Sequence, residues 1–429
     1  MASTRLPNEE KEFIAASKEE NPSCLLKNMK TLFWFGAILG IAGYVLVVWL
    51  PQNYFYIGWE NVPELPGLEE KWVSTLDKDV KLQSITFSSE DGQCSGDLYE
   101  PASEKSKYKN TKGEFPIIIM GHGIGSTRDQ GLQRFAEKFA NQGLAVLAFD
   151  YRTYGRSPGL PRHYLSPTRH VQDFKNAVAY VQSLSFVDKK RIVLWGSRFT
   201  FSKKKKLHIP ENSWIFFIFI FFHIFLKISY GGGHVIKAAS DLPSLAAVIS
   251  QVPFMGNTPH ESKLDEMKKR GLKVIGLGLL GSISANIRHW LGMPEIYGPI
   301  YAHQSTQPFR LAMNYWELIG EPQESWLEKH PKNRPNDWKN GALIRPLFDV
   351  LTYRPVASVE KISPNTKVLY IAAKKDKLCP MERVQYALKK TPHAEMALLD
   401  CGHFDVYAGE SFEQNIRAQL HFLEKILLP

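Results

Sequence analysis

Residues 192–197 read IVLWGS and residues 229–233 read SYGGG, and the 31 residues between them, 198–228, read RFTFSKKKKLHIPENSWIFFIFIFFHIFLKI. If that segment is left out, the sequence at the junction becomes WGSSYGG, which contains a Gly-x-Ser-x-Gly motif centred on Ser229. The motif then follows a short strand-like run directly and precedes a helical pattern. Removing one residue more on either side destroys it. This dependence on register indicates that residues 198–228 are foreign to the fold.

Outward from this motif, short apolar runs typical of buried parallel strands recur along the chain. They are residues 115–120, 144–149, 192–195, 246–252, 368–372 and 394–399. Helical patterns at 132–141 and 171–184 separate several of them, and 80–87 alternates with period two ahead of a hairpin partner at 96–99. Alternation of strand and helix predicts an α/β fold with a mostly parallel sheet covered on both faces.

A run of about one hundred residues, rich in Trp, Leu, Met and Pro, interrupts this alternation. We expect residues 256–356 to contain no strands and to form a helical cap inserted over one end of the sheet. Parallel sheets of this kind bind ligands beyond the carboxyl ends of their strands. The α/β domain with its cap is predicted to span residues 60–429.

Polar residues follow several predicted strands at the edge where ligands are expected. GHGIG occupies 121–125 after one strand, Asp376 follows another, and His403 follows the next. An acid followed by a histidine is the order found in a Ser-Asp-His triad, where the carboxylate fixes the imidazole tautomer. Alternatives remain open for the acid and for the histidine: Asp400, Asp405, His393 and His421.

Together these segments resemble the α/β-hydrolase superfamily, and most closely the branch that contains YcjY-like, serine-aminopeptidase-like and X-Pro-dipeptidyl-peptidase-like hydrolases. The resemblance runs from about residue 81 to residue 428. It is carried by MGHGIGSTRDQGL, FDYRTYGRSPGLPR, RIVLWGS, YGGGHV, AAKKDKLCP and CGHFDVY. It implies an α/β-hydrolase fold and a serine hydrolase that needs no cofactor or metal.

The resemblance also implies roles for individual residues. Asp376 would be the triad acid and His403 the base, and the backbone N–H of Ile124 would hold the oxyanion. Ser229 would be the nucleophile, and the N–H of Tyr230, the next residue, would be the second oxyanion donor. The segment that begins at Asp150 would help to wall the site.

One contiguous Gly-x-Ser-x-Gly match competes with the split motif. It is GRSPG at 155–159, with Ser157 at its centre. We reject it as the nucleophile because it lies several residues beyond its strand and is followed by loop-like rather than helical sequence.

The foreign segment has a genetic explanation. Arg198 and Ser229 can be encoded by codons that a splice donor and acceptor would split and rejoin as one serine codon, and a Phe- and Ile-rich stretch is what a pyrimidine-rich tract would encode. We interpret 198–228 as a translated, retained intron. A second membrane segment and a family-specific loop are the alternatives. Residues 214–226 are short for a span and contain His223.

A membrane span is predicted near the N-terminus. No charged residue occurs in 31–59, and the apolar residues 32–50 are long enough to cross the hydrocarbon core. We expect a polar tail at 1–30, a transmembrane helix at 31–51 closed by Pro51, and a lumenal or extracellular catalytic domain, because Lys27 and Lys30 precede the span. A buried helix and a cleaved signal peptide are the alternatives.

Composition excludes several other classes. The chain of 429 residues has 44% hydrophobic and 22% charged residues, which excludes whole-chain disorder and a multi-span transporter. Its net charge of +10 suggests nucleic acid, but half of that excess lies in 198–228 and no nucleic-acid motif accompanies it. Four cysteines without paired spacing exclude a zinc ribbon. Whether Cys379 and Cys401 form a disulfide is left open.

The sequence therefore predicts a membrane-anchored serine hydrolase acting on a small-molecule ester, or on a small peptide or amide. It predicts no nucleic-acid partner. Because the nucleophile motif is interrupted, the chain as written is expected to be inactive or nearly so. The competing prediction is a catalytically inactive membrane protein that keeps the fold as a binding platform.

Overall fold

The computed structural model describes only part of the chain. The described residues are 22–63, 74–101, 106–123, 125–197, 230–242, 245–261, 272–298, 300, 339–376 and 379–429. Ile124, Ser229 and the predicted insertion 198–228 lie outside them, and so does the first part of the predicted polar tail. The structure therefore does not test the predictions for these residues.

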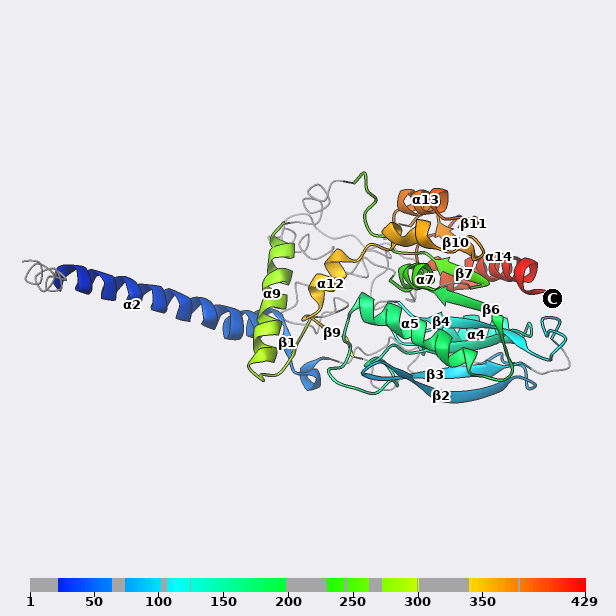
Figure 1. The fold of residues 1–429 in the computed structure, drawn as a ribbon, viewed down its shortest axis with the longest axis horizontal. Helices are drawn as coiled ribbons and strands as arrows, with labels where there is room; N and C mark the ends of the chain where they lie inside the picture. The colour runs from blue at the N-terminus through cyan, green and yellow to red at the C-terminus, as the bar shows by residue number, and fades with distance from the viewer. Residues whose placement is uncertain are drawn as a thin grey trace, which may run out of the picture.

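An eight-stranded sheet forms the centre of the domain, in the order β11-β10-β7-β6-β4-β5-β3-β2 (Figure 1). Its strands are β2 (Lys81–Ser89), β3 (Gly92–Glu100), β4 (Phe115–Gly121), β5 (Ala145–Phe149), β6 (Val187–Gly196), β7 (Ala247–Gln251), β10 (Lys367–Ala373) and β11 (Ala394–Leu399). The six strands from β11 to β5 are parallel, whereas β3 pairs antiparallel with β5 and with β2. The predicted mostly parallel sheet is confirmed.

Helices cover both faces of the sheet. Successive side chains of a strand point to opposite faces, so the apolar strands present apolar side chains on each face that must be buried. In β4, Ile118 packs in one core with α4 (Leu132–Ala140) and α14 (Gly409–Leu427). Its neighbour Ile119 packs in the opposite core. That core also contains side chains of α5 (Pro167–Gln182), α7 (Tyr230–Asp241), η3 (Pro355–Lys361) and α13 (Met381–Lys390).

The described part of the segment that we predicted to lack strands contains two strands. β8 (Ile296–Gly298) pairs antiparallel with β9 (Ala342–Leu343) and with β1 (Tyr56–Ile57), which comes from the N-terminal part of the chain. The expectation of a strand-free cap was wrong because strands of two or three residues are too short to show a period in sequence. The cap helices that the structure describes are α9 (Leu272–Trp290) and α12 (Leu347–Thr352).

A long apolar helix precedes the domain and projects from it (Figure 1). It consists of α2 (Pro22–Tyr44), the π-helical turn η1 (Val45–Trp49) and α3 (Leu50–Tyr54). Within it lies Thr31–Asn53, whose most apolar stretch of 18 residues has a mean hydropathy of 2.1 and is not buried, so its length and composition suit a membrane span. A signal sequence would pass the same test.

Pro51 does not end this helix, contrary to expectation. The helix continues to Tyr54, because the π-helical turn before the proline lets the Leu50 N–H donate to the carbonyl of Val45 rather than of Leu46. The ring of Pro51 is thereby accommodated near the start of a new short helix, where a missing N–H costs little.

Candidate active site

The two halves of the split motif meet in space. An ideal Cβ placed on Gly196, at the end of β6, would lie 2.0 Å from the carbonyl oxygen of Gly231 in α7. A Cβ on Gly231 would lie 2.2 Å from the carbonyl oxygen of Ser197. Real Cβ atoms essentially never come closer than 3.0 Å, so only glycine fits at these two positions. The strand and the helix therefore approach as closely as a strand–serine–helix turn requires.

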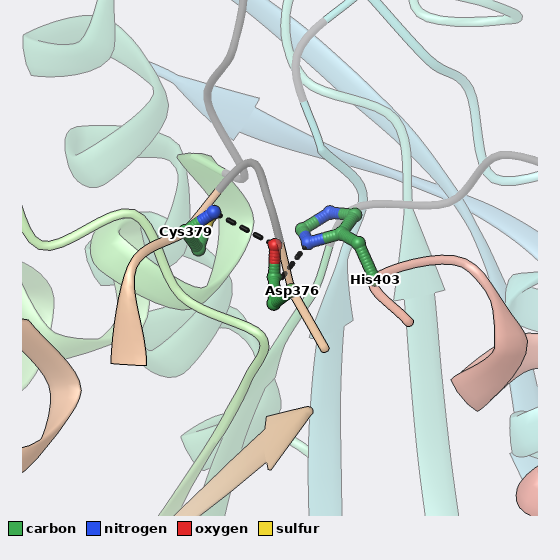
Figure 2. Close-up of side chains that lie close together, drawn as sticks. All are labelled: Asp376, Cys379 and His403. Atoms are coloured by element: carbon green, nitrogen blue, oxygen red, sulfur yellow. Dashed lines mark hydrogen bonds and ion pairs between the residues drawn. The ribbon is translucent and has the colours of Figure 1, made fainter. Parts of the chain in front are cut away.

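Asp376 and His403 lie side by side beyond the carboxyl ends of β10 and β11. His403 Nδ1 donates to Asp376 Oδ2 over 2.6 Å, and both side chains are almost fully buried. The backbone N–H of Cys379 donates to the other carboxylate oxygen over 2.8 Å. Figure 2 shows the carboxylate held between these two donors. The other ring nitrogen, His403 Nε2, is buried and has no hydrogen-bond partner among the described residues.

The rival residues make other contacts. Asp405 accepts a hydrogen bond from the Gly402 N–H over 2.7 Å, and Asp400 forms an exposed ion pair with Lys375. His393 and His421 have exposed side chains. Of the acids and histidines considered from sequence, Asp376 and His403 are the pair that the described structure brings together.

The loop after β4 lies against the start of α7. A Cβ on Gly231 would also lie 2.9 Å from the carbonyl oxygen of His122. The His122 ring is held by its own loop, because Nδ1 donates to the Gly123 carbonyl over 2.9 Å, and Tyr151 Oη donates to the His122 carbonyl over 3.0 Å. Ile124 follows directly in this loop but lies outside the described residues.

Ser157, which we rejected as the nucleophile, has a structural role. Its hydroxyl is fully buried, donates to the Asp150 carbonyl over 2.7 Å and accepts from the Ser95 N–H over 2.8 Å. The Asp150 carboxylate in turn accepts from the backbone N–H of Arg128 over 2.7 Å and forms an ion pair with its guanidinium. These contacts bind the loop after β5 to the loop after β4.

A buried polar network that the sequence did not predict connects β6 to the histidine loop. Ser197 Oγ is hydrogen-bonded to Tyr407 Oη over 2.6 Å and accepts from Gln251 Nε2 over 2.8 Å. Gln251 Oε1 accepts from Asn415 and Gln419 of α14 over 2.6 and 2.8 Å. Two features of the sequence indicate this network. Gln251 ends an apolar strand, and Asn415 and Gln419 are amides spaced four residues apart on the buried face of one helix.

Four histidines, His122, His163, His170 and His234, are fully buried and lie close to aromatic rings. Tyr151 stacks on His170 at 4.1 Å between ring centroids, and the other stacked pairs are Tyr154 with His163 and Tyr230 with His234. Burial lowers the pKa of His122, His163 and His234 to about 3, and that of His170 well below its usual value. These imidazoles are therefore neutral in the folded protein.

The structure contains no disulfide between Cys379 and Cys401. One group of donor atoms within the described ranges is compact enough to hold a metal ion. Its members are Asp376, Cys379 and His403, whose ligand atoms lie within 4.8 Å of one another. The hydrogen bond between the acid and the imidazole already occupies two of these donors.

The quorum-quenching protein AidA of Acinetobacter baumannii (strain MDR-ZJ06) is 30% identical over 343 residues, which cover 80% of this chain and 94% of that protein. The chain belongs to the α/β-hydrolase superfamily. A sequence profile described as serine aminopeptidase, S33, matches residues 113–197 and so ends at the residue before the segment that we predict to be an insertion. This placement makes the chain a member of a family of hydrolases.

More distant relatives agree. The thiohydrolase aneE of Aspergillus aculeatus (strain ATCC 16872 / CBS 172.66 / WB 5094) is 21% identical, over 73% of this chain and 86% of that protein. The crystal structure of the α/β hydrolase GrgF from Penicillium sp. sh18 matches with a TM-score of 0.58 at 19% identity, covering 81% of this chain and 99% of that one. The latter likeness supports the fold.

The buried histidines predict that stability falls in acid. Because their pKa values are lowered in the folded state, the unfolded chain binds more protons below about pH 6.5, and folding becomes less favourable as the pH falls towards 3. Each such histidine should cost about 2 kcal/mol between pH 7 and pH 5. His163→Asn keeps a donor for the Gly341 carbonyl, which His163 Nδ1 contacts at 2.8 Å, and removes the titration.

Urea unfolding in detergent at several pH values measures this effect. We expect His163→Asn to lower the slope of the unfolding free energy against pH by the equivalent of about one proton. Equal pH dependence in His163→Asn and the parent chain would contradict the prediction.

Proposed function

We propose that this chain is a membrane-anchored serine hydrolase that cleaves an ester bond of a small molecule. Ser229 would be the nucleophile, His403 the general base and then the general acid, and Asp376 the residue that orients His403. The observation that carries the proposal is the buried hydrogen bond between Asp376 and His403, which leaves His403 Nε2 without a partner among the described residues.

This arrangement supports a balanced acyl transfer. Asp376 accepts a hydrogen bond from the Nδ1–H of His403, so Nε2 carries the lone pair that takes the proton of Ser229 as its oxygen attacks the carbonyl carbon. The imidazolium that forms is stabilised by the carboxylate, which the Cys379 N–H also holds in place. Nε2 then gives the proton to the leaving alcohol. In the second half, Nε2 takes a proton from water as the water oxygen attacks the acyl carbon, and it returns that proton to the Ser229 oxygen as the acid leaves.

Two backbone N–H groups are proposed to bind the oxyanion. They belong to Ile124, in the loop after β4, and to Tyr230, the first residue of α7. The close approach of His122 to Gly231 supports this pairing, because it brings the loop against the start of the helix. Removing one donor of this kind typically raises a barrier by about 3 to 4 kcal/mol.

The names of the relatives help to choose the class of bond that is cleaved, but not the identity of the substrate. One relative is called a quorum-quenching protein and another a thiohydrolase. The second name favours hydrolysis of a bond to sulfur, and neither name refers to cleavage of a protein. A small ester or thioester is therefore our first substrate class, and a small peptide or amide the second.

Domain limits are part of the same proposal. We assign the hydrolase domain to residues 60–429, the cap to 256–356 and the foreign insertion to 198–228. The contact between Gly196 and Gly231 supports the last of these, because the chain on either side of the insertion meets without a gap that the insertion would fill.

The interruption favours a second candidate for the 429-residue form, an inactive binding platform. A tight turn between strand and helix aims the serine at the substrate, and misplacing a reacting group by about 1 Å can cost about a hundredfold in rate. Thirty-one inserted residues between Ser197 and Ser229 remove that constraint. The fold survives because loop closure costs only about 0.6 kcal/mol for each doubling of length.

Deleting residues 198–228 should restore activity. We expect the shortened protein to hydrolyse a small aryl ester and to react with a fluorophosphonate at Ser229, because the deletion rebuilds the tight turn. The 429-residue form should react slowly or not at all. Mass spectrometry of the labelled peptide identifies the modified residue, and Ser229→Ala in the shortened protein is the control. Equal labelling of both forms, or labelling at Ser157, would refute the assignment.

In the shortened protein, His403→Ala should lower kcat/KM by several orders of magnitude. Asp376→Asn should lower it by about three to four orders, because the imidazole then loses the carboxylate that fixes its tautomer. The matched control is Asp405→Asn, since an amide oxygen can still accept from the Gly402 N–H. A silent Asp376→Asn together with a crippling Asp405→Asn would move the acid to Asp405.

The anchor proposal assigns 31–51 to a membrane span with the domain in the lumen or outside the cell, because Lys27 and Lys30 precede the span. A protease added outside sealed microsomes should therefore spare the domain and digest it only after detergent is added. Digestion of the domain in intact microsomes would show the reverse orientation.

A further inference from the structure

The carboxyl end of the N-terminal apolar helix is joined to the cap helix α9 by two side chains. The π-helical turn directs the Leu50 N–H to Val45 and so leaves the Leu46 carbonyl without its usual helical donor. Pro51 has no N–H to offer the Val47 carbonyl, four residues before it. Ser284 Oγ donates to Leu46 O over 2.6 Å, and Arg288 Nη1 donates to Val47 O over 2.7 Å.

Both donors are almost fully buried, so they belong to a packed contact rather than to a surface bridge. The apolar part of that contact is a cluster of Leu50, Phe55, Ala285 and Ile296. A Cβ on Gly281 of α9 would lie 2.5 Å from the Phe55 ring, which shows how closely the two segments approach. Figure 1 shows α9 lying crosswise at the end of the long helix. The helix and the cap therefore form one rigid joint.

Another side of α9 carries large apolar side chains that no described residue covers, with the polar Asn286 exposed among them. The exposed fractions are 42% for Leu280, 49% for Ile283 and 84% for Trp290, and Leu291 just beyond the helix is 51% exposed. Ile283, Trp290 and Leu291 follow Leu280 by three, ten and eleven residues, and these spacings put the side chains on one side of a helix. Arg288, the basic residue in the last turn of α9, points instead into the joint.

We propose that this face of α9, defined by Leu280, Ile283, Trp290 and Leu291, lies in the interfacial layer of the lipid bilayer that the N-terminal helix crosses. The inference rests on the anchor part of the proposed function. Its occupant is the bilayer because α9 is fixed to the carboxyl end of the 23-residue apolar helix Thr31–Asn53, at the depth where such a helix leaves the hydrocarbon core.

The side chains suit that layer. A helix with an apolar face that includes Trp, lying in the membrane plane, is typical of interfacial binding, and Trp is enriched at this depth. Trp49, at the carboxyl end of the π-helical turn, is 44% exposed and provides a second aromatic ring near the joint. Two neighbouring elements, one crossing the bilayer and one lying on it, then hold the cap against the membrane.

This placement orients the catalytic edge. The loops at the carboxyl ends of the strands contact the cap: a Cβ on Gly125 would lie 2.6 Å from Ile300, and His163 Nδ1 donates to Gly341 O. Asp376 and His403 lie at the same edge of the sheet. Docking of α9 therefore turns that edge towards the bilayer and favours an ester that partitions into lipid as substrate.

Spin-label accessibility tests the docking in the full 429-residue chain. A nitroxide is attached at Ile283→Cys in a Cys24→Ser background, where Cys94, Cys379 and Cys401 are buried, and the protein is placed in phosphatidylcholine vesicles. The measurement is the ratio of collisions with oxygen, which partitions into lipid, to collisions with a water-soluble nickel chelate. Leu82→Cys, an exposed site on the edge strand β2, is the matched control in water.

We expect the ratio at residue 283 to exceed that at residue 82 severalfold. Equal ratios at these two sites would overturn the docking. A third label, at Phe35→Cys in the apolar helix, separates the two proposals. If residue 35 lies in lipid and residue 283 in water, the docking is wrong while the anchor stands. If residue 35 also lies in water, the anchor is wrong and the docking falls with it.

Discussion

The close approach of β6 to α7 is the constraint on which the site depends. Gly196 and Gly231 face backbone atoms where no Cβ fits, so the strand and the helix meet at a separation that only glycine allows. Most loops tolerate added residues because their ends need only remain near each other. A nucleophile turn also requires a particular backbone path between those ends. If residues 198–228 are an insertion, as we propose, the fold would tolerate them while the proposed nucleophile turn would be lost.

Buried polar contacts carry this constraint to the rest of the site. Ser197, next to Gly196, is bonded to Tyr407 and Gln251, so the end of β6 is tied to the loop that follows His403. Asp150 and Arg128 tie the loops after β5 and β4 together in the same way. Buried polar groups are costly unless they are paired, so each contact favours one arrangement of these loops over alternatives.

Sequence patterns predicted the parts of the molecule that repeat or that follow strands in order. The parallel sheet followed from its apolar runs, and the neighbouring positions of Asp376 and His403 followed from the order of strand, acid, strand and histidine. The three-stranded sheet of β1, β8 and β9 was missed because its strands are too short to show a period. Gln251 was missed because its partners come from α14, more than 160 residues away. Patterns within a short stretch of sequence do not predict hydrogen bonds between side chains so far apart in the chain.

The joint between the apolar helix and α9 has a consequence for the order of synthesis. Ser284 lies 238 residues after Leu46, and Arg288 lies 241 residues after Val47. At about 5 to 20 residues per second, the ribosome needs roughly 10 to 50 s to make that stretch. The helix thus leaves the ribosome long before the side chains that donate to its Leu46 and Val47 carbonyls exist. Most of the sheet is made during that interval, so the cap can complete the joint only after β2 to β7 have been synthesised.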